Sequence, residues 1–122
     1  MEKTSNNKEF KVALIGDSVL DNFYWLDKKE EDVKYQLNTL LKKNNENSFC
    51  LNYALDESQT KDILNGKTPS TVYSSDRKNI GMEPYLTEKD GKVHPLKLLE
   101  NNKDITHVVL SIGGNDVRVE IL

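Results

Sequence analysis

Two short apolar runs, one near each end of the chain, both stop at glycine followed by small polar side chains. Residues 12–15 lead into Gly16-Asp17-Ser18, and residues 108–112 lead into Gly113-Gly114-Asn115-Asp116. A continuous apolar run of this length is typical of a strand buried on both faces, as in a parallel sheet. Open α/β sheets bind their ligands at the carboxyl ends of such strands. The pattern therefore predicts that Ser18 and Asn115 share one rim of a parallel sheet.

The segments between these runs predict helices that cross from strand to strand. Strands are predicted over residues 11–15, 49–55 and 106–112. An amphipathic helix is predicted over 30–43, with the aromatic segment 23–26 packed under it, and shorter helices are predicted to end at Leu64 and to open at Pro95. Residues 67–92 are polar and lack periodicity, which is typical of a lid or binding loop. After Asp116 we expect a helix capped by Asn115 or Asp116, with a strand as the alternative.

This order of elements predicts an α/β fold in which about three parallel strands are joined by crossovers. The 122 residues make one domain over 10–122, preceded by a polar tail over 1–9. Met1 to Glu9 lack the apolar core of a signal peptide, and the apolar runs are too short to cross a bilayer. We therefore expect a cytoplasmic protein without a transmembrane segment.

Charge and cysteine content exclude several classes of partner. The net charge is −3 and no basic run is present, which argues against nucleic acid or an anionic membrane as a partner. The single Cys50 forms no internal disulfide and makes no metal site by itself, so we expect a buried strand residue there. No metal or cofactor is expected.

The two glycine-polar motifs, in this order and each after a strand, resemble the first and third sequence blocks of the SGNH (GDSL-type) hydrolases. Residues 52–60, Asn-Tyr-Ala-Leu-Asp-Glu-Ser-Gln-Thr, are similar to the second block, in which a glycine normally follows the aspartate. Glu57 occupies that place here. The resemblance spans about residues 10 to 120. It implies a three-layer α/β/α, flavodoxin-like fold that is incomplete here, and hydrolysis of ester bonds through a serine nucleophile.

Carried onto this chain, the resemblance makes Ser18 the nucleophile and its backbone N–H one oxyanion donor. The Asn115 amide would be a second donor and the backbone N–H of Glu57 a third. Glu57 is expected to be a weak donor, because a positive φ is costly without glycine and its carboxylate repels an oxyanion. Supporting positions are Asp17, Gly114 and Asp116, and the two aspartates are expected to brace their turns through hydrogen bonds.

The family's general base and its orienting acid lie in an Asp-x-x-His segment near the C-terminus of a longer chain, and we expect this chain to stop before that segment. His94 and His107 are the only histidines. At 3.3 Å per residue of strand, His107 is expected roughly 16 Å from the rim. His94 is expected to reach the rim only by an unusual loop path. The chain alone is therefore predicted to be inactive, or nearly so, towards a small-molecule ester.

Two alternatives to the hydrolase stay open. One is a non-catalytic pseudoenzyme or binding module that holds an acyl or sugar group between Ser18 and Asn115. The other is a structural remnant without a ligand. The family's strand order also predicts that the first strand is central and that the third is an uncovered apolar edge. Because such edges recruit other chains, self-association is expected.

Overall fold

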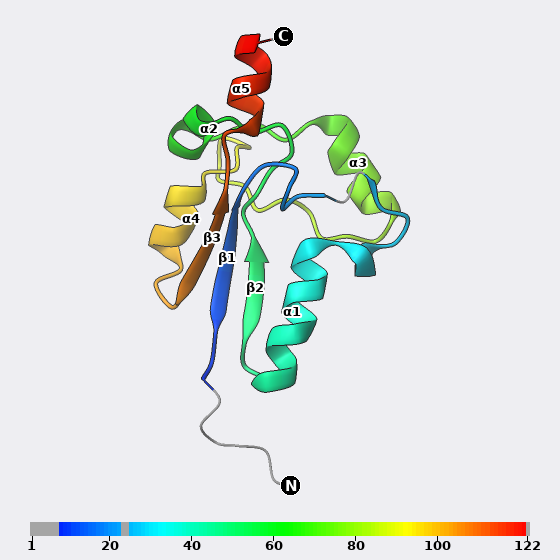
Figure 1. The fold of residues 1–122 in the computed structure, drawn as a ribbon, viewed down its shortest axis with the longest axis vertical. Helices are drawn as coiled ribbons and strands as arrows, with labels where there is room; N and C mark the ends of the chain where they lie inside the picture. Colours follow the sequence, from blue (N-terminus) through cyan, green and yellow to red (C-terminus); the bar gives the residue numbers. More distant parts are fainter. Residues whose placement is uncertain (1–7, 23–24, 122) are drawn as a thin grey trace, which may run out of the picture.

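The chain, seen in a computed structural model, forms an α/β unit around a three-stranded parallel sheet (Figure 1). The strands are β1 (Lys11–Gly16), β2 (Phe49–Asn52) and β3 (His107–Ser111), in the spatial order β2-β1-β3. Both outer strands run parallel to β1, so the carboxyl ends of all three meet at one edge of the sheet. The predicted class, the parallel pairing and the central first strand are confirmed, while the second strand is shorter than the predicted 49–55.

The structure describes residues 8–22 and 25–121. The predicted polar tail over 1–9 therefore lies outside the described residues except for its last two, and Phe23 and Tyr24 of the aromatic segment lie outside them as well. Trp25 is 67% exposed, so the expectation that it packs under a helix was wrong. No helix within the described ranges is long and apolar enough to cross a membrane.

β1 is almost fully buried because its side chains alternate between two apolar layers on opposite faces of the sheet. Val12 and Leu14 pack with Cys50 against α1 (Val33–Asn44). Successive side chains of a strand point to opposite faces, so Ala13 and Ile15 face the other layer. That second layer includes Tyr53, Leu55, Val93 and Leu98, the last of which belongs to α4 (Pro95–Asn101). Figure 1 shows α1 and α4 on opposite sides of the sheet.

The helix boundaries follow local capping. The predicted first helix begins three residues late, because Asp32 accepts a hydrogen bond from the Tyr35 N–H as an N-cap, and a 3₁₀ turn (Lys29–Glu31) precedes it. α2 (Thr60–Asn65) is followed by the C-cap Gly66, whose φ of 80° suits glycine. α4 begins at Pro95, as predicted.

Two helix predictions need correction. The segment 67–92, predicted to lack regular structure, contains α3 (Thr71–Asn79), which Ser70 caps by accepting from the Tyr73 N–H. This helix was missed because it has little apolar periodicity of its own. The chain after β3 is a helix and not a strand, but α5 (Gly114–Ile121) begins before Asn115. Asn115 and Asp116 therefore lie in its first turn and are not its caps.

β3 is exposed along the edge that does not pair with β1. Val108, Val109 and Leu110 are each at least 41% exposed, although they belong to the run expected to be buried on both faces. Helix α5 continues beyond the carboxyl end of the sheet and does not fold back over β3 (Figure 1). The strand therefore presents apolar side chains together with unpaired backbone groups.

We predict that the chain self-associates through this edge, because an exposed apolar strand offers backbone hydrogen bonds to a second strand. Leu110→Lys, at the most exposed of the three positions, should shift the protein towards the monomer in light scattering at tens of micromolar. Val72→Lys, at an exposed apolar position on α3, is the matched control and should leave the association unchanged. A monodisperse wild-type monomer at these concentrations would contradict the prediction.

Candidate functional site at the carboxyl edge of the sheet

The turn that carries Ser18 is held between β1 and β3. The Asp17 N–H donates to the Ser111 carbonyl at 3.1 Å, and the Asp21 N–H donates to the Asp17 carbonyl at 2.9 Å. Gly16 allows this close approach, since a Cβ there would lie 1.9 Å from the Ser111 oxygen. The Asp17 carboxylate accepts from the Val19 N–H, so it braces the turn as expected. Ser18 is left partly exposed just past the end of β1.

The second segment, residues 55–60, is joined to the same turn. The Leu55 N–H donates to the Gly16 carbonyl at 3.0 Å, and the Asp56 N–H donates to the buried Asp21 carboxylate at 2.8 Å. Glu57 follows with a φ of 72°, the left-handed conformation that the resemblance would give to glycine. Its side chain is exposed.

The third segment, the first turn of α5, contacts the second through two side chains. The Asn115 amide donates to the Ser58 carbonyl at 2.8 Å. Asp116 accepts from the backbone N–H of Thr60 at 2.9 Å and from its hydroxyl at 3.0 Å. Asp116 therefore braces α2, which is distant in sequence, and not its own turn. Gly114 is exposed at the first position of α5.

These bonds bring the three motif segments to one edge of the sheet. Ser18 follows β1 and Asn115 follows the adjacent parallel strand β3, so both leave the sheet at the same end. Within the described part of the chain, no hydrogen bond joins Ser18 to Asn115, whose amide is directed to Ser58.

His107 lies at the opposite, amino end of β3, as predicted. Residues 104–107, Asp-Ile-Thr-His, match the Asp-x-x-His letters, and the sequence reasoning overlooked them. Their geometry is not that of a catalytic pair: Asp104 binds Lys11 at 3.2 Å, while the His107 ring contacts the Thr106 hydroxyl at 2.8 Å and packs edge-on against Phe10. The matching letters therefore supply no base to the rim.

His94, unlike His107, forms a hydrogen-bonded pair with an acidic side chain, that of Asp90. Its Nε2 lies 2.7 Å from Asp90, and this hydrogen bond lowers the pKa of the Asp90 carboxyl. The imidazole packs against Gly66, where an added Cβ would lie 2.4 Å from the ring. No hydrogen bond connects His94 with Ser18 among the described residues.

Sequence reasoning missed a buried polar cluster directly behind the rim. The Asp21 carboxylate is fully buried and accepts from the Tyr85 hydroxyl at 2.7 Å and from the Arg77 guanidinium at 3.3 Å. Arg77 also donates to the Glu83 carbonyl and lies over the Tyr85 ring, 4.2 Å from its centroid. A buried charge needs such partners, because desolvation without them is costly. The one feature of the sequence that could have indicated this cluster was Arg77, which lies in the segment 67–92 that was predicted to be a loop.

Burial raises the pKa of Asp21 to about 6, although hydrogen bonds from Tyr85 and Asp56 and the charge of Arg77 act against the shift. Burial, and then the Asp21 charge, raise the pKa of the Tyr85 hydroxyl. Asp56 is also buried, and its pKa is raised by burial and by the neighbouring Glu57 charge. The described residues include no group of three His, Cys, Asp or Glu side chains placed to hold a metal ion.

Comparisons with protein-family models, with curated proteins and with solved structures give no match to the chain. The family resemblance therefore rests on the three motifs and their order.

The strain at position 57 gives a stability prediction. Glu57→Gly should stabilise the fold by about 1 kcal/mol relative to Glu57→Ala, because a left-handed φ is unfavourable for a residue with a Cβ. The alanine variant serves as the matched control, since it also removes the carboxylate. Urea unfolding of the two proteins tests this, and equal stability would contradict it.

Asp21 gives a prediction on pH. Its pKa is higher in the folded state than the ordinary value of 3.8, so the folded protein retains this proton between about pH 4 and pH 6 while the unfolded chain loses it. Protonated Asp21 therefore contributes roughly 3 kcal/mol to the free energy of unfolding. This contribution is fully present below about pH 4 and is lost as the pH rises through about 6.

The free energy of unfolding of wild type, taken relative to Asp21→Asn, should fall over this interval. Asp27→Asn, at an exposed aspartate, should retain the wild-type profile. Parallel curves for wild type and Asp21→Asn would show that Asp21 does not titrate in this way.

Proposed function

We propose that the rim is the site of an ester hydrolase of the SGNH type, with Ser18 as nucleophile. The proposal includes the three-layer α/β/α, flavodoxin-like SGNH fold. Its main support is the convergence of the three motif segments through the bonds Asp17–Ser111, Leu55–Gly16 and Asn115–Ser58. Backbone and amide donors near a serine are the groups that stabilise the oxyanion of an acyl-transfer intermediate.

In the proposed reaction, the Ser18 hydroxyl attacks the ester carbonyl and the carbonyl oxygen becomes negatively charged. The Ser18 backbone N–H and the Asn115 amide would donate to this oxygen. The Asn115 amide carries two N–H groups, so one can bind Ser58 while the other serves the oxyanion. The Glu57 N–H is the weakest candidate, because the adjacent carboxylate repels a negative charge.

A serine hydroxyl is a weak nucleophile until a base removes its proton. His107 lies at the wrong end of β3, and His94 is bound to Asp90. The chain alone is therefore expected to be inactive or nearly so. The second candidate is a pseudoenzyme that binds an acyl group at the same rim. A partly exposed Ser18 can contact such a group without catalysing a reaction.

We predict that wild type and Ser18→Ala hydrolyse a short-chain aryl ester at nearly the same rate. For both, the acceleration over the reaction in water should not exceed the roughly 10³–10⁴-fold that hydrogen-bond donors and substrate binding alone provide. Added imidazole should then give a Ser18-dependent increase by supplying the base in solution. Ser74→Ala, at an exposed serine on α3, controls for the general effect of the substitution.

Equal rates for wild type and Ser18→Ala in imidazole would overturn the hydrolase proposal. Saturable binding of the ester without Ser18-dependent turnover would then favour the binding module. Strong Ser18-dependent turnover without imidazole would contradict the predicted inactivity, and His94→Asn would test whether that histidine is the base.

A further inference from the structure

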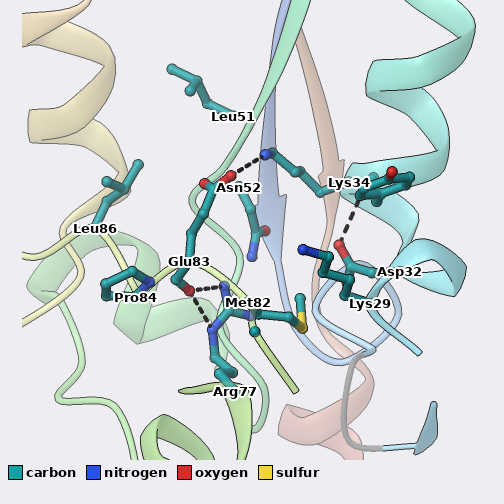
Figure 2. Close-up of a pocket in the computed structure, with 12 residues that line it drawn as sticks. Lys29, Asp32, Lys34, Leu51, Asn52, Arg77, Met82, Glu83, Pro84 and Leu86 are labelled. Carbon is teal, nitrogen blue, oxygen red and sulfur yellow. Dashed lines mark hydrogen bonds and ion pairs between the residues drawn. The ribbon is translucent and has the colours of Figure 1, made fainter. Parts of the chain in front are cut away.

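A cavity of about 240 Å³ lies beside β2, an outer strand of the sheet, and not at the rim (Figure 2). Its walls include the apolar side chains of Leu51, Met82 and Leu86 and the polar side chains of Asp32 and Asn52. Ser18, Glu57 and Asn115 do not line it. Its volume is below the range of drug-sized sites and suits a small metabolite.

Asp32 lines this cavity and carries one carboxylate oxygen without a hydrogen-bond partner in the described part of the chain. The residue is only 2% exposed, and one oxygen accepts the Tyr35 N–H that begins α1. The other oxygen, Oδ1, is buried and has no hydrogen-bond partner within the described part of the chain. A buried acceptor left in this state costs free energy, so a ligand that donates a hydrogen bond to it would be favoured.

Donors border the same cavity. The Asn52 side-chain oxygen accepts from the Ala54 N–H at 3.0 Å, which leaves the amide nitrogen directed towards the cavity in Figure 2. Lys29 extends its ammonium to the Gly81 turn, 3.9 Å from where a Cβ on Gly81 would be. These two groups can donate to an anionic part of a ligand.

The other charges of the lining are already matched. Lys34 binds Glu83 at 3.0 Å, and Arg77 is paired with Asp21. Lys29 and Asp32 form no ion pair in the described ranges, although the charges of Arg77 and Lys34 act on the Asp32 carboxylate, and the two side chains carry opposite charges. A simple cation would be repelled by Lys29 and a simple anion by Asp32, whereas a molecule with both charges matches both.

We propose that this cavity binds a small zwitterion of the α-amino-acid class with an aliphatic side chain. The ligand ammonium donates to Asp32 Oδ1, and its carboxylate accepts from Lys29 and Asn52. The aliphatic part lies against Leu51 and Met82. Because Oδ1 has almost no contact with solvent, the side chains that cover it have to move aside when the ligand enters. This site is independent of the proposed Ser18 chemistry.

The probe for the test is L-leucine, titrated into the full chain and followed by backbone amide NMR. Saturable shifts are expected at Tyr35, Asn52 and Gly81. Two matched compounds each lack one charge: 3-methylbutylamine has no carboxylate, and 4-methylpentanoate has no ammonium. Both should bind at least about tenfold more weakly than leucine. Absence of saturable leucine binding, or equal affinity for either compound, would overturn the proposal.

Asp32→Asn tests the acceptor directly. Asparagine is an equally good N-cap, so α1 should be retained, while an amide in place of the carboxylate should weaken leucine binding by about tenfold or more. Lys29→Gln is the second variant, and it should weaken leucine binding without weakening 3-methylbutylamine binding. Asp27→Asn and Ser18→Ala should bind leucine as wild type does. Unchanged leucine affinity in folded Asp32→Asn or in Lys29→Gln would contradict the site.

Discussion

The buried carboxylate of Asp21 is the constraint on which the upper half of the structure depends. It accepts from the backbone of Asp56 in the second motif, and from Arg77 and Tyr85 in the polar segment 67–92. These bonds join the turn after β1 to the second motif and to the polar segment that contains α3. Tyr85 of that segment also packs against the apolar core, so polar and apolar contacts together position it. The raised pKa of Asp21 reflects the desolvation that this arrangement imposes.

The rim is held by backbone hydrogen bonds and by the side chains of Asp21, Asn115 and Asp116. Gly16 lets the end of β1 approach the Ser111 carbonyl, and Asp17 and Leu55 then continue the pairing of the strands into the loops. Beyond the Asn115 bond to Ser58, Asp116 connects α5 to α2 by accepting from Thr60. The cavity beside β2 is lined by long side chains such as Lys29 and Met82.

The two histidines show why spacing alone is a weak guide to chemistry. Asp104 and His107 have the spacing of a catalytic pair, yet each contacts a different neighbour and both lie at the amino end of β3. His94 and Asp90 lack the spacing and do form a hydrogen-bonded pair. The direction of β3 places Asp104 and His107 away from the rim. The path of the loop before α4 brings Asp90 and His94 together. A four-residue spacing predicts neither placement.

The sequence by itself determined the parallel strands and the common end at which Ser18 and Asn115 leave the sheet, while the central position of β1 was implied by the family resemblance. It could do so because apolar runs and glycines act locally, through burial and backbone freedom. It also indicated the strain at Glu57, where a glycine was expected. Only the tertiary structure decided the Asp21–Arg77–Tyr85 cluster and the unsatisfied oxygen of Asp32. The cluster joins groups up to 64 residues apart. The Asp32 oxygen is buried by the packing around it, and no periodic pattern in the sequence records either.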